Sequence, residues 1–182
     1  MEQLSNRPDR KIRPAVDADL SGILAIYNDV IATSTAVYTD DPVCIEERRS
    51  WLAGQLGQGY PVLVSHEAGS VVGFASFGDF RAWPGYRHTV EHSVHVRQDR
   101  RGSGVGRSLV EALIPLAAAM GKHVMIAGVD AANTSSIRFH KHLGFEQVAH
   151  FREVGRKFDR WLDLVFLQRF VGQTCRHNSP SW

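Results

Sequence analysis

Residues 100–107 read Arg-Arg-Gly-Ser-Gly-Val-Gly-Arg, and this segment lies between a predicted strand and a predicted helix. Alternating glycines allow the backbone to adopt positive φ angles and to approach a ligand closely. A helix that begins here presents free N–H groups and the positive end of its dipole. The segment therefore suits a phosphate group, to which Arg100, Arg101 and Arg107 add positive charge. For a glycine loop alone, a solvated surface turn is the alternative.

Two common nucleotide-binding motifs do not fit this loop. A Walker A motif needs Gly-Lys-Ser or Gly-Lys-Thr four residues after a glycine, and the loop has no such triplet. The Rossmann fingerprint fails because Arg107 stands where its third glycine belongs. A Rossmann domain also carries its loop after the first strand, whereas this loop follows an apparent hairpin. A different phosphate-bearing ligand is therefore indicated.

A carboxylate lies on the predicted strand that leads into the loop. This is Glu91, within Thr-Val-Glu-His-Ser at 89–93. In a partly dry cleft the pKa of a carboxyl group rises toward neutral pH, so the group can act as a general base. An arbitrary strand glutamate would instead be expected at the surface. The choice between the two interpretations depends on the family resemblance described below.

The nine histidines raise the question of a metal site, but their spacing does not support one. His140 and His142 are two residues apart on a predicted helix, so they point to different faces. Glu91, His92 and His95 do not form an HExxH motif. We expect no metal.

Hydrophobic periodicity predicts the elements that must position these residues. A short strand at 11–16 precedes a helix that Asp17 or Asp19 caps, with apolar residues spaced along 20–31. The remaining elements are a helix at 43–57 opened by Pro42, strands at 61–66, 71–80 and 89–96, a helix from 105 to 116 that Pro115 is expected to kink, a strand at 123–129, a helix from Asn133 to Gly144, and strands at 145–151 and 161–170. Strands adjacent in sequence imply antiparallel pairs, and the β-α-β portions imply a parallel piece in the middle. The expected fold is a mixed α/β sheet, twisted, with helices on both faces.

Length and composition bound the class of protein. The 182 residues suit one domain at 11–171 with polar tails at 1–10 and 172–182. Hydrophobic residues make up 43% and charged residues 22%, which excludes disorder as the dominant state. A net charge of +2 argues against a dedicated nucleic-acid binder. Without a long apolar run or a signal peptide, we expect no membrane association and a cytoplasmic location.

Three motifs in the right order and spacing resemble the GNAT N-acyltransferase superfamily. Arg101-Gly-Ser-Gly-Val-Gly106 matches its R/Q-x-x-G-x-G/A pyrophosphate loop. The strand Val90–Val96 resembles the central family strand, and Asn133–Phe145 resembles the Asn-led helix that ends in Gly-Phe. The resemblance covers residues 12–170. It implies the GNAT fold and acetyl-CoA as the co-substrate.

Four shorter segments narrow the resemblance to the phosphinothricin acetyltransferase group and its relatives that act on methionine sulfoximine and methionine sulfone. These segments are 26–28, 33–35, 89–93 and 155–163. The resemblance implies transfer of acetyl to the α-amine of a small amino acid or analogue, by direct attack in a ternary complex. It also implies a homodimer.

The same resemblance implies roles for individual residues. Glu91 would accept the amine proton, directly or through water, as the catalytic base. His140 stands where many GNAT enzymes carry tyrosine, and it could act as the acid for the leaving thiolate, orient the substrate, or share the role of base. The implied contacts to acetyl-CoA are the backbone of Val94, His95 and Val96 along the pantetheine arm, the loop residues Arg101, Gly102, Ser103, Gly104, Val105, Gly106 and Arg107 at the pyrophosphate, and Asn133 and Ser136 nearby.

An amino-acid acceptor carries a carboxylate, which needs a cation. Arg81, just after the second hairpin strand, is the predicted clamp. Three aromatic residues are predicted to contact the acceptor, namely Phe77, Tyr38 and Tyr86. Lys157 and Trp161 are weaker candidates, at the interface of a dimer.

Two other functions stay open from the sequence. A non-catalytic acyl-CoA-binding regulatory module would keep the loop but lack turnover. An acetyltransferase for polyamines or protein N-termini would share the chemistry. A polyamine site needs clustered carboxylates, and the 77–91 region offers Asp79 and Glu91 but also Arg81 and Arg87. This mixture favours an anionic acceptor.

Overall fold

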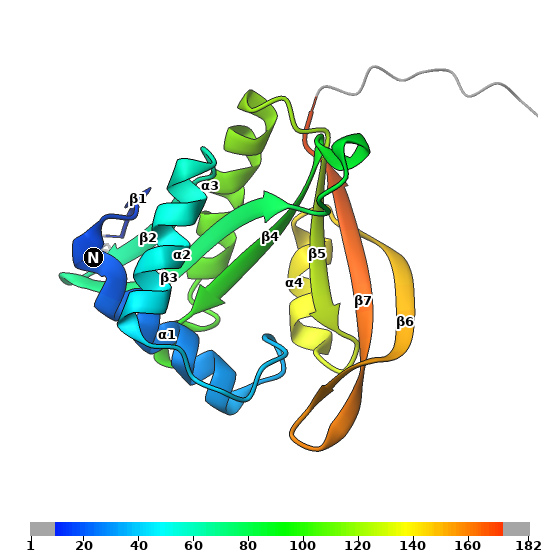
Figure 1. Cartoon of the computed structure of the whole chain (residues 1–182), viewed down its shortest axis with the longest axis horizontal. Coiled ribbons are helices and arrows are strands. Elements are labelled where there is room, and N and C mark those ends of the chain that lie inside the picture. Colours follow the sequence, from blue (N-terminus) through cyan, green and yellow to red (C-terminus); the bar gives the residue numbers. More distant parts are fainter. Residues whose placement is uncertain (1–9, 173–182) are drawn as a thin grey trace, which may run out of the picture.

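The computed structural model describes residues 10–172 and contains one seven-stranded sheet in the order β1-β2-β3-β4-β5-β7-β6 (Figure 1). The strands are β1 (Lys11–Pro14), β2 (Val62–Glu67), β3 (Ser70–Asp79), β4 (Thr89–Val96), β5 (Val124–Asp130), β6 (Glu146–Lys157) and β7 (Arg160–Phe170). The helices are α1 (Leu20–Thr33), α2 (Ile45–Gly57), α3 (Val105–Ala119) and α4 (Thr134–His142), with short 3-10 turns at Asp17–Asp19, Pro84–Tyr86 and Gln98–Arg100. The mixed α/β sheet and the order of its elements are as predicted.

The largest differences from the predicted boundaries are in β6 and α3. Strand β6 extends to Lys157, six residues beyond the predicted end, because most of its side chains are exposed and no alternation marks it. Its register against β7 also shifts between Phe151 and Gly155, which hides the strand period. Helix α3 continues past Pro115 to Ala119. The predicted tails lie outside the described residues, except for Arg10 and Gly172.

Helices cover the sheet from both faces, so the core has two parts. On one face, α1 and α2 bury an apolar cluster that includes Ile23, Leu52 and Phe74. On the other face, α3 packs against the central strands through residues such as Leu109 and Leu113. Because both faces are covered, β3 is buried almost along its whole length.

The sheet opens between its two central strands. Strand β4 pairs in parallel with β5 only where Thr89–Glu91 faces Val124–Ile126. Beyond this point β4 stays paired with β3 up to Val96, while β5 stays paired with β7 up to Asp130. The two strands therefore diverge, as Figure 1 shows. The open edge of β4 beyond Glu91 leaves backbone N–H and C=O groups without a strand partner.

A buried lysine ties the β6–β7 hairpin to the end of α1. The side chain of Lys157 is 1% exposed, and its Nζ donates to the carbonyl oxygens of Ile31 (2.7 Å), Ser34 (2.7 Å) and Val37 (2.8 Å). Lys157 therefore joins elements of the same chain through a buried side chain, while Trp161 on the same hairpin is 62% exposed. No helix in the described range is long and apolar enough to cross a membrane.

Candidate active site

The glycine loop has the backbone geometry that a close approach requires. Gly102 and Gly104 have φ angles of +77° and +86°, and Gly104 is the N-cap of α3. The Ser103 hydroxyl donates to the Arg100 carbonyl oxygen at 2.6 Å, which closes the turn. The Ser108 N–H donates back to the Gly104 carbonyl oxygen. The N–H groups before Ser108, at the start of α3, are those that a helix leaves open to a ligand.

The buried carboxylate of Glu67 anchors this loop through two arginines. Glu67 accepts hydrogen bonds from Arg10 Nε (2.7 Å) and Arg100 Nε (3.2 Å), and Arg10 Nη2 donates to the Ser103 carbonyl oxygen at 3.0 Å. Arg100 thus binds Glu67, while Arg101 and Arg107 stay exposed at the loop. Sequence reasoning missed Arg10 and Glu67, because nothing in their local pattern marks a contact over so many residues.

Glu91 stands at the point where the sheet opens. It is the last residue of β4 that pairs with β5, and its carboxylate lies against Gly128 of β5. Burial raises the pKa of Glu91, and the positive charge of Arg81 partly offsets this rise. A half-buried carboxylate with a raised pKa and no ion pair within the described chain can accept a proton.

Gly128 makes room for this carboxylate. A methyl group at position 128 would lie 2.8 Å from Glu91 Oε1 and 3.2 Å from the Phe166 ring. We expect Gly128→Ala to displace the Glu91 side chain and to lower kcat by about 10- to 100-fold, because small misplacements of a reacting group are costly. The Kd for acetyl-CoA, measured by calorimetry, should stay nearly constant. Gly54→Ala, at an exposed helical position with open space around it, is the control; an unchanged kcat in Gly128→Ala would contradict the role of this contact.

Three buried histidines surround the opening, and burial keeps them neutral. Burial lowers the pKa of His92 to about 3 and that of His95 to about 4, and it also lowers the pKa of His140. His140 Nδ1 lies 2.8 Å from the Ser136 carbonyl oxygen, so this nitrogen carries the proton. His140 Nε2 is buried with no partner in residues 10–172. A neutral ring with its proton on Nδ1 can accept a hydrogen bond at Nε2, which suits the orienting and base roles among the three that the sequence left open.

The start of α4 forms the opposite edge of the opening. Asn133 caps this helix, with its Oδ1 accepting from the Ser136 N–H at 3.0 Å and from the Ser135 hydroxyl at 2.8 Å. A methyl group on Gly106 of α3 would lie 3.5 Å from the Phe139 ring of α4. The start of α3 therefore lies close to the second half of α4.

A cavity of about 320 Å³ occupies this opening. Its lining includes Glu91, Val94, His95, Asn133, Ser136 and His140, all of which the sequence predicted, together with His92, Ser93, Gly128 and Asp130 from the sheet. Helices α1 and α2 add Tyr27, Arg48 and Trp51, and Ala36 and Val37 come from the loop between them. The sequence did not single out these helical residues, because apolar periodicity does not separate core positions from cleft positions.

The predicted acceptor residues are dispersed. Phe77 is 1% exposed in the core, where its ring packs against Tyr60. It does not line the cavity and is therefore not a contact of the acceptor. Arg81 is exposed and does not line the cavity, but its charge acts on Glu91. Its guanidinium lies 5.0 Å from the Phe80 ring, and Tyr86 packs edge-on against the same ring. Tyr38 lies over Gly155 of the hairpin.

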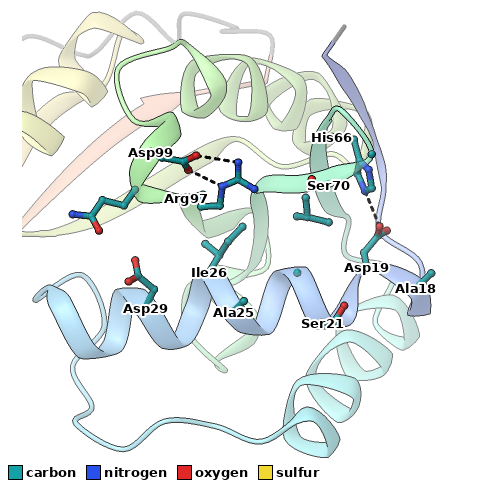
Figure 2. Close-up of a pocket in the computed structure, with 14 residues that line it drawn as sticks. Ala18, Asp19, Ser21, Ala25, Ile26, Asp29, His66, Ser70, Arg97 and Asp99 are labelled. Carbon is teal, nitrogen blue, oxygen red and sulfur yellow. Dashed lines mark hydrogen bonds and ion pairs between the residues drawn. The ribbon is translucent and has the colours of Figure 1, made fainter. Parts of the chain in front are cut away.

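A second cavity, of about 680 Å³, lies between α1, the β2–β3 turn and residues 97–99 (Figure 2). Its buried carboxylate, Asp19, accepts from Arg13 (2.7 and 2.9 Å) and pairs with His66 (2.8 Å). Burial opposes ionisation of Asp19, but these hydrogen bonds outweigh it and lower its pKa to about 2. Arg97 is likewise paired with Asp99. Because Asp19 and Arg97 are both paired, this cavity offers less for catalysis than the opening at Glu91.

Comparison with known proteins agrees with this geometry. Residues 12–166 match the family model described as an acetyltransferase (GNAT) domain. An L-methionine sulfoximine/L-methionine sulfone acetyltransferase of Pseudomonas paraeruginosa is 51% identical over 158 residues, which cover 86% of this chain and 92% of the relative. A phosphinothricin N-acetyltransferase of Streptomyces coelicolor is 35% identical over 87% of this chain and 95% of its own. A solved Salmonella typhimurium structure that contains acetyl-CoA has a TM-score of 0.87 and 45% identity, covering 94% of this chain and 98% of its own.

Proposed function

Because the chain belongs to the GNAT acetyltransferase family, we propose that it transfers acetyl from acetyl-CoA to the α-amine of a small amino acid or analogue. Methionine sulfone, methionine sulfoximine and phosphinothricin are the first candidates, since they are the substrates in the names of its relatives. One observation carries the proposal. The bare helix start of α3 and the half-buried Glu91 lie at the two ends of the same open edge of β4.

The residues around the open edge fit acetyl-CoA, which supplies the acetyl group as a thioester. The N–H groups at Gly104, Val105 and Gly106 would bind the pyrophosphate, with Arg101 and Arg107 adding positive charge. The six residues from Glu91 to Val96 span about 17 Å, so an extended pantetheine arm can lie beside β4. The unpaired N–H groups of that edge would hold the arm, and one of them would face the thioester oxygen.

Glu91 would perform the proton transfer. The acceptor binds as an ammonium, which must lose a proton before its nitrogen can attack. Glu91 takes this proton, directly or through water. His140 Nε2, a free acceptor in the same cleft, would orient the amine by accepting a hydrogen bond. Arg81 would bind the α-carboxylate at the rim next to Glu91, since its charge already acts on that side chain.

An acceptor screen tests the proposal. Purified protein with acetyl-CoA should release free thiol with amino-acid analogues, and kcat/KM should be higher for them than for spermidine or an N-terminal peptide. No thiol release with any acceptor, despite normal binding of acetyl-CoA, would instead indicate a regulatory module. A higher kcat/KM for spermidine would instead indicate that the acceptor is a polyamine.

The pH profile has a predictable direction. Glu91 acts only when ionised, so kcat/KM should fall as the pH drops through its raised pKa, above the range of an ordinary glutamate. Arg81 lowers that pKa, so Arg81→Met should move the acidic limb of the profile to higher pH. Arg87→Met, an exposed arginine that does not act on Glu91, should leave the limb in place. If the acidic limb of the kcat/KM profile lies at the same pH in both variants, Glu91 is not the group whose ionisation sets that limb.

We also propose a homodimer and a cytoplasmic location, where acetyl-CoA is available. Strands β6 and β7 and their turn expose several large apolar side chains, namely Val148, Phe151, Val154, Phe158 and Trp161. A patch of this kind favours a protein partner. Sedimentation velocity should give twice the 20.3 kDa chain mass, and Trp161→Glu should shift the protein toward the monomer. A monomer at micromolar concentration would contradict this assignment.

A further inference from the structure

One buried cation in the cleft has no acidic partner. Arg48 of α2 is 6% exposed, and its Nε is buried without a hydrogen bond. Within the described chain, its guanidinium forms no hydrogen bond and no ion pair. Burying a charge without a partner is costly, so such a group in a cleft indicates a missing ligand.

Aromatic rings hold Arg48 in place without neutralising it. Its Cζ lies 3.8 Å from the centre of the Tyr27 ring and 4.6 Å from that of Trp51. Contacts with ring faces stabilise a guanidinium but leave the N–H donors in its own plane free. The carboxylate of the neighbouring residue, Glu47, is exposed and accepts from the Cys44 N–H at 2.7 Å as part of the helix cap. It therefore does not fill the role of partner.

The two cations of the cleft act at different places. The charge of Arg81 acts on Glu91. Arg48 instead lies toward His95, four residues further along β4, because the Tyr27 ring that its Cζ contacts at 3.8 Å has its centre 5.6 Å from that of the His95 ring. Residues 91, 93 and 95 share one face of the strand, the face that α1 and α2 cover. In an amino acid the carboxylate and the amine share one carbon atom. The carboxylate must therefore stay close to the base, which leaves Arg48 for the far end of the acceptor.

We infer that Arg48 is a specificity-determining residue that binds an oxygen atom at the end of the acceptor's side chain. The ligand class is an amino acid whose side chain ends in a tetrahedral oxo group: a sulfone, a sulfoximine or a phosphinate. A guanidinium presents parallel N–H donors that suit two oxygen atoms on one centre. The rings of Tyr27 and Trp51 offer apolar surface to the methylene groups that lead to it. This inference rests on the proposed acetyl transfer to amino acids.

The test compares acceptors that differ only in the distal oxygen atoms. Methionine sulfone and methionine have the same chain length, and norleucine lacks the sulfur atom altogether. In Arg48→Met, kcat/KM for methionine sulfone should fall by about 10- to 100-fold, which is the range for a lost hydrogen bond from a charged donor. The kcat/KM values for methionine and norleucine should change less than about threefold. Arg48→Lys keeps the charge but loses the paired donors, so its loss should be intermediate.

The matched control is Arg81→Met, which should lower kcat/KM for all three acceptors together. An equal loss for all three acceptors in Arg48→Met would overturn the inference, since it would indicate an α-carboxylate or packing role. No loss for any of them would also overturn it. Because Arg48→Met could unfold, competition by dimethyl sulfone against methionine sulfone in the wild type gives a second measurement, and no competition would count against the inference. If the wild type acetylates none of these acceptors, it is the proposed function that fails.

Discussion

Replacing Glu91 by glutamine is expected to lower kcat by about 10²- to 10⁴-fold, the range that a general base contributes. Glutamine keeps the shape of the side chain and its packing against Gly128, but it cannot take a proton from the ammonium. The Kd for acetyl-CoA should stay within about twofold, because the pyrophosphate loop and the open edge of β4 are untouched. Steady-state kinetics and calorimetry on the same preparation separate the two effects.

The stability of Glu91→Gln provides an independent check. Burial raises the pKa of Glu91, so the folded state disfavours the ionised form, and the carboxylate lowers the free energy of unfolding at neutral pH. Glutamine removes this penalty, so Tm should stay equal or rise while activity is lost. Glu146→Gln, on an exposed part of β6, should change neither quantity. A kcat close to that of the wild type in Glu91→Gln would remove Glu91 from the proton transfer.

Gly104→Val is expected to weaken acetyl-CoA binding by at least about 30-fold. The φ angle of +86° at Gly104 is one that a β-branched residue adopts only with strain of about 1–3 kcal/mol, and relief of that strain would turn the N–H groups away from the pyrophosphate. The side chain would also lie beside the place where the phosphate approaches. Only the Arg10 guanidinium, at 3.5 Å from a methyl group at this position, comes near, so the fold itself has room for the change.

Gly121→Val is the matched control, because Gly121 follows the other end of α3 with a φ of +69° and open space around it. It should carry a similar strain and a similar loss of Tm but a normal Kd for acetyl-CoA. If both variants bound acetyl-CoA normally in calorimetry, the glycine loop would not be the pyrophosphate site.

Local sequence patterns were sufficient to predict the strands and helices but not the residues that line the cleft. Alternation and helical spacing predicted the strands and helices in order, since most of them bury an apolar face. They failed for the second half of β6, which is exposed and bulged. Phe77 was misplaced because alternation separates two faces of a strand without saying which face meets the cleft. Arg48 was missed because its partners, Tyr27 and Trp51, come from two helices whose crossing no short motif records.

The three hydrogen bonds from Lys157 couple the β6–β7 hairpin to the cleft. They fasten the hairpin to the last turn of α1 and to the loop that contributes Ala36 and Val37 to the cleft. A shift of the hairpin tip would therefore move the loop that lines one side of the 320 Å³ cavity. Substitutions at the tip would then change the shape of that cavity, even though Phe158 and Asp159 do not line it.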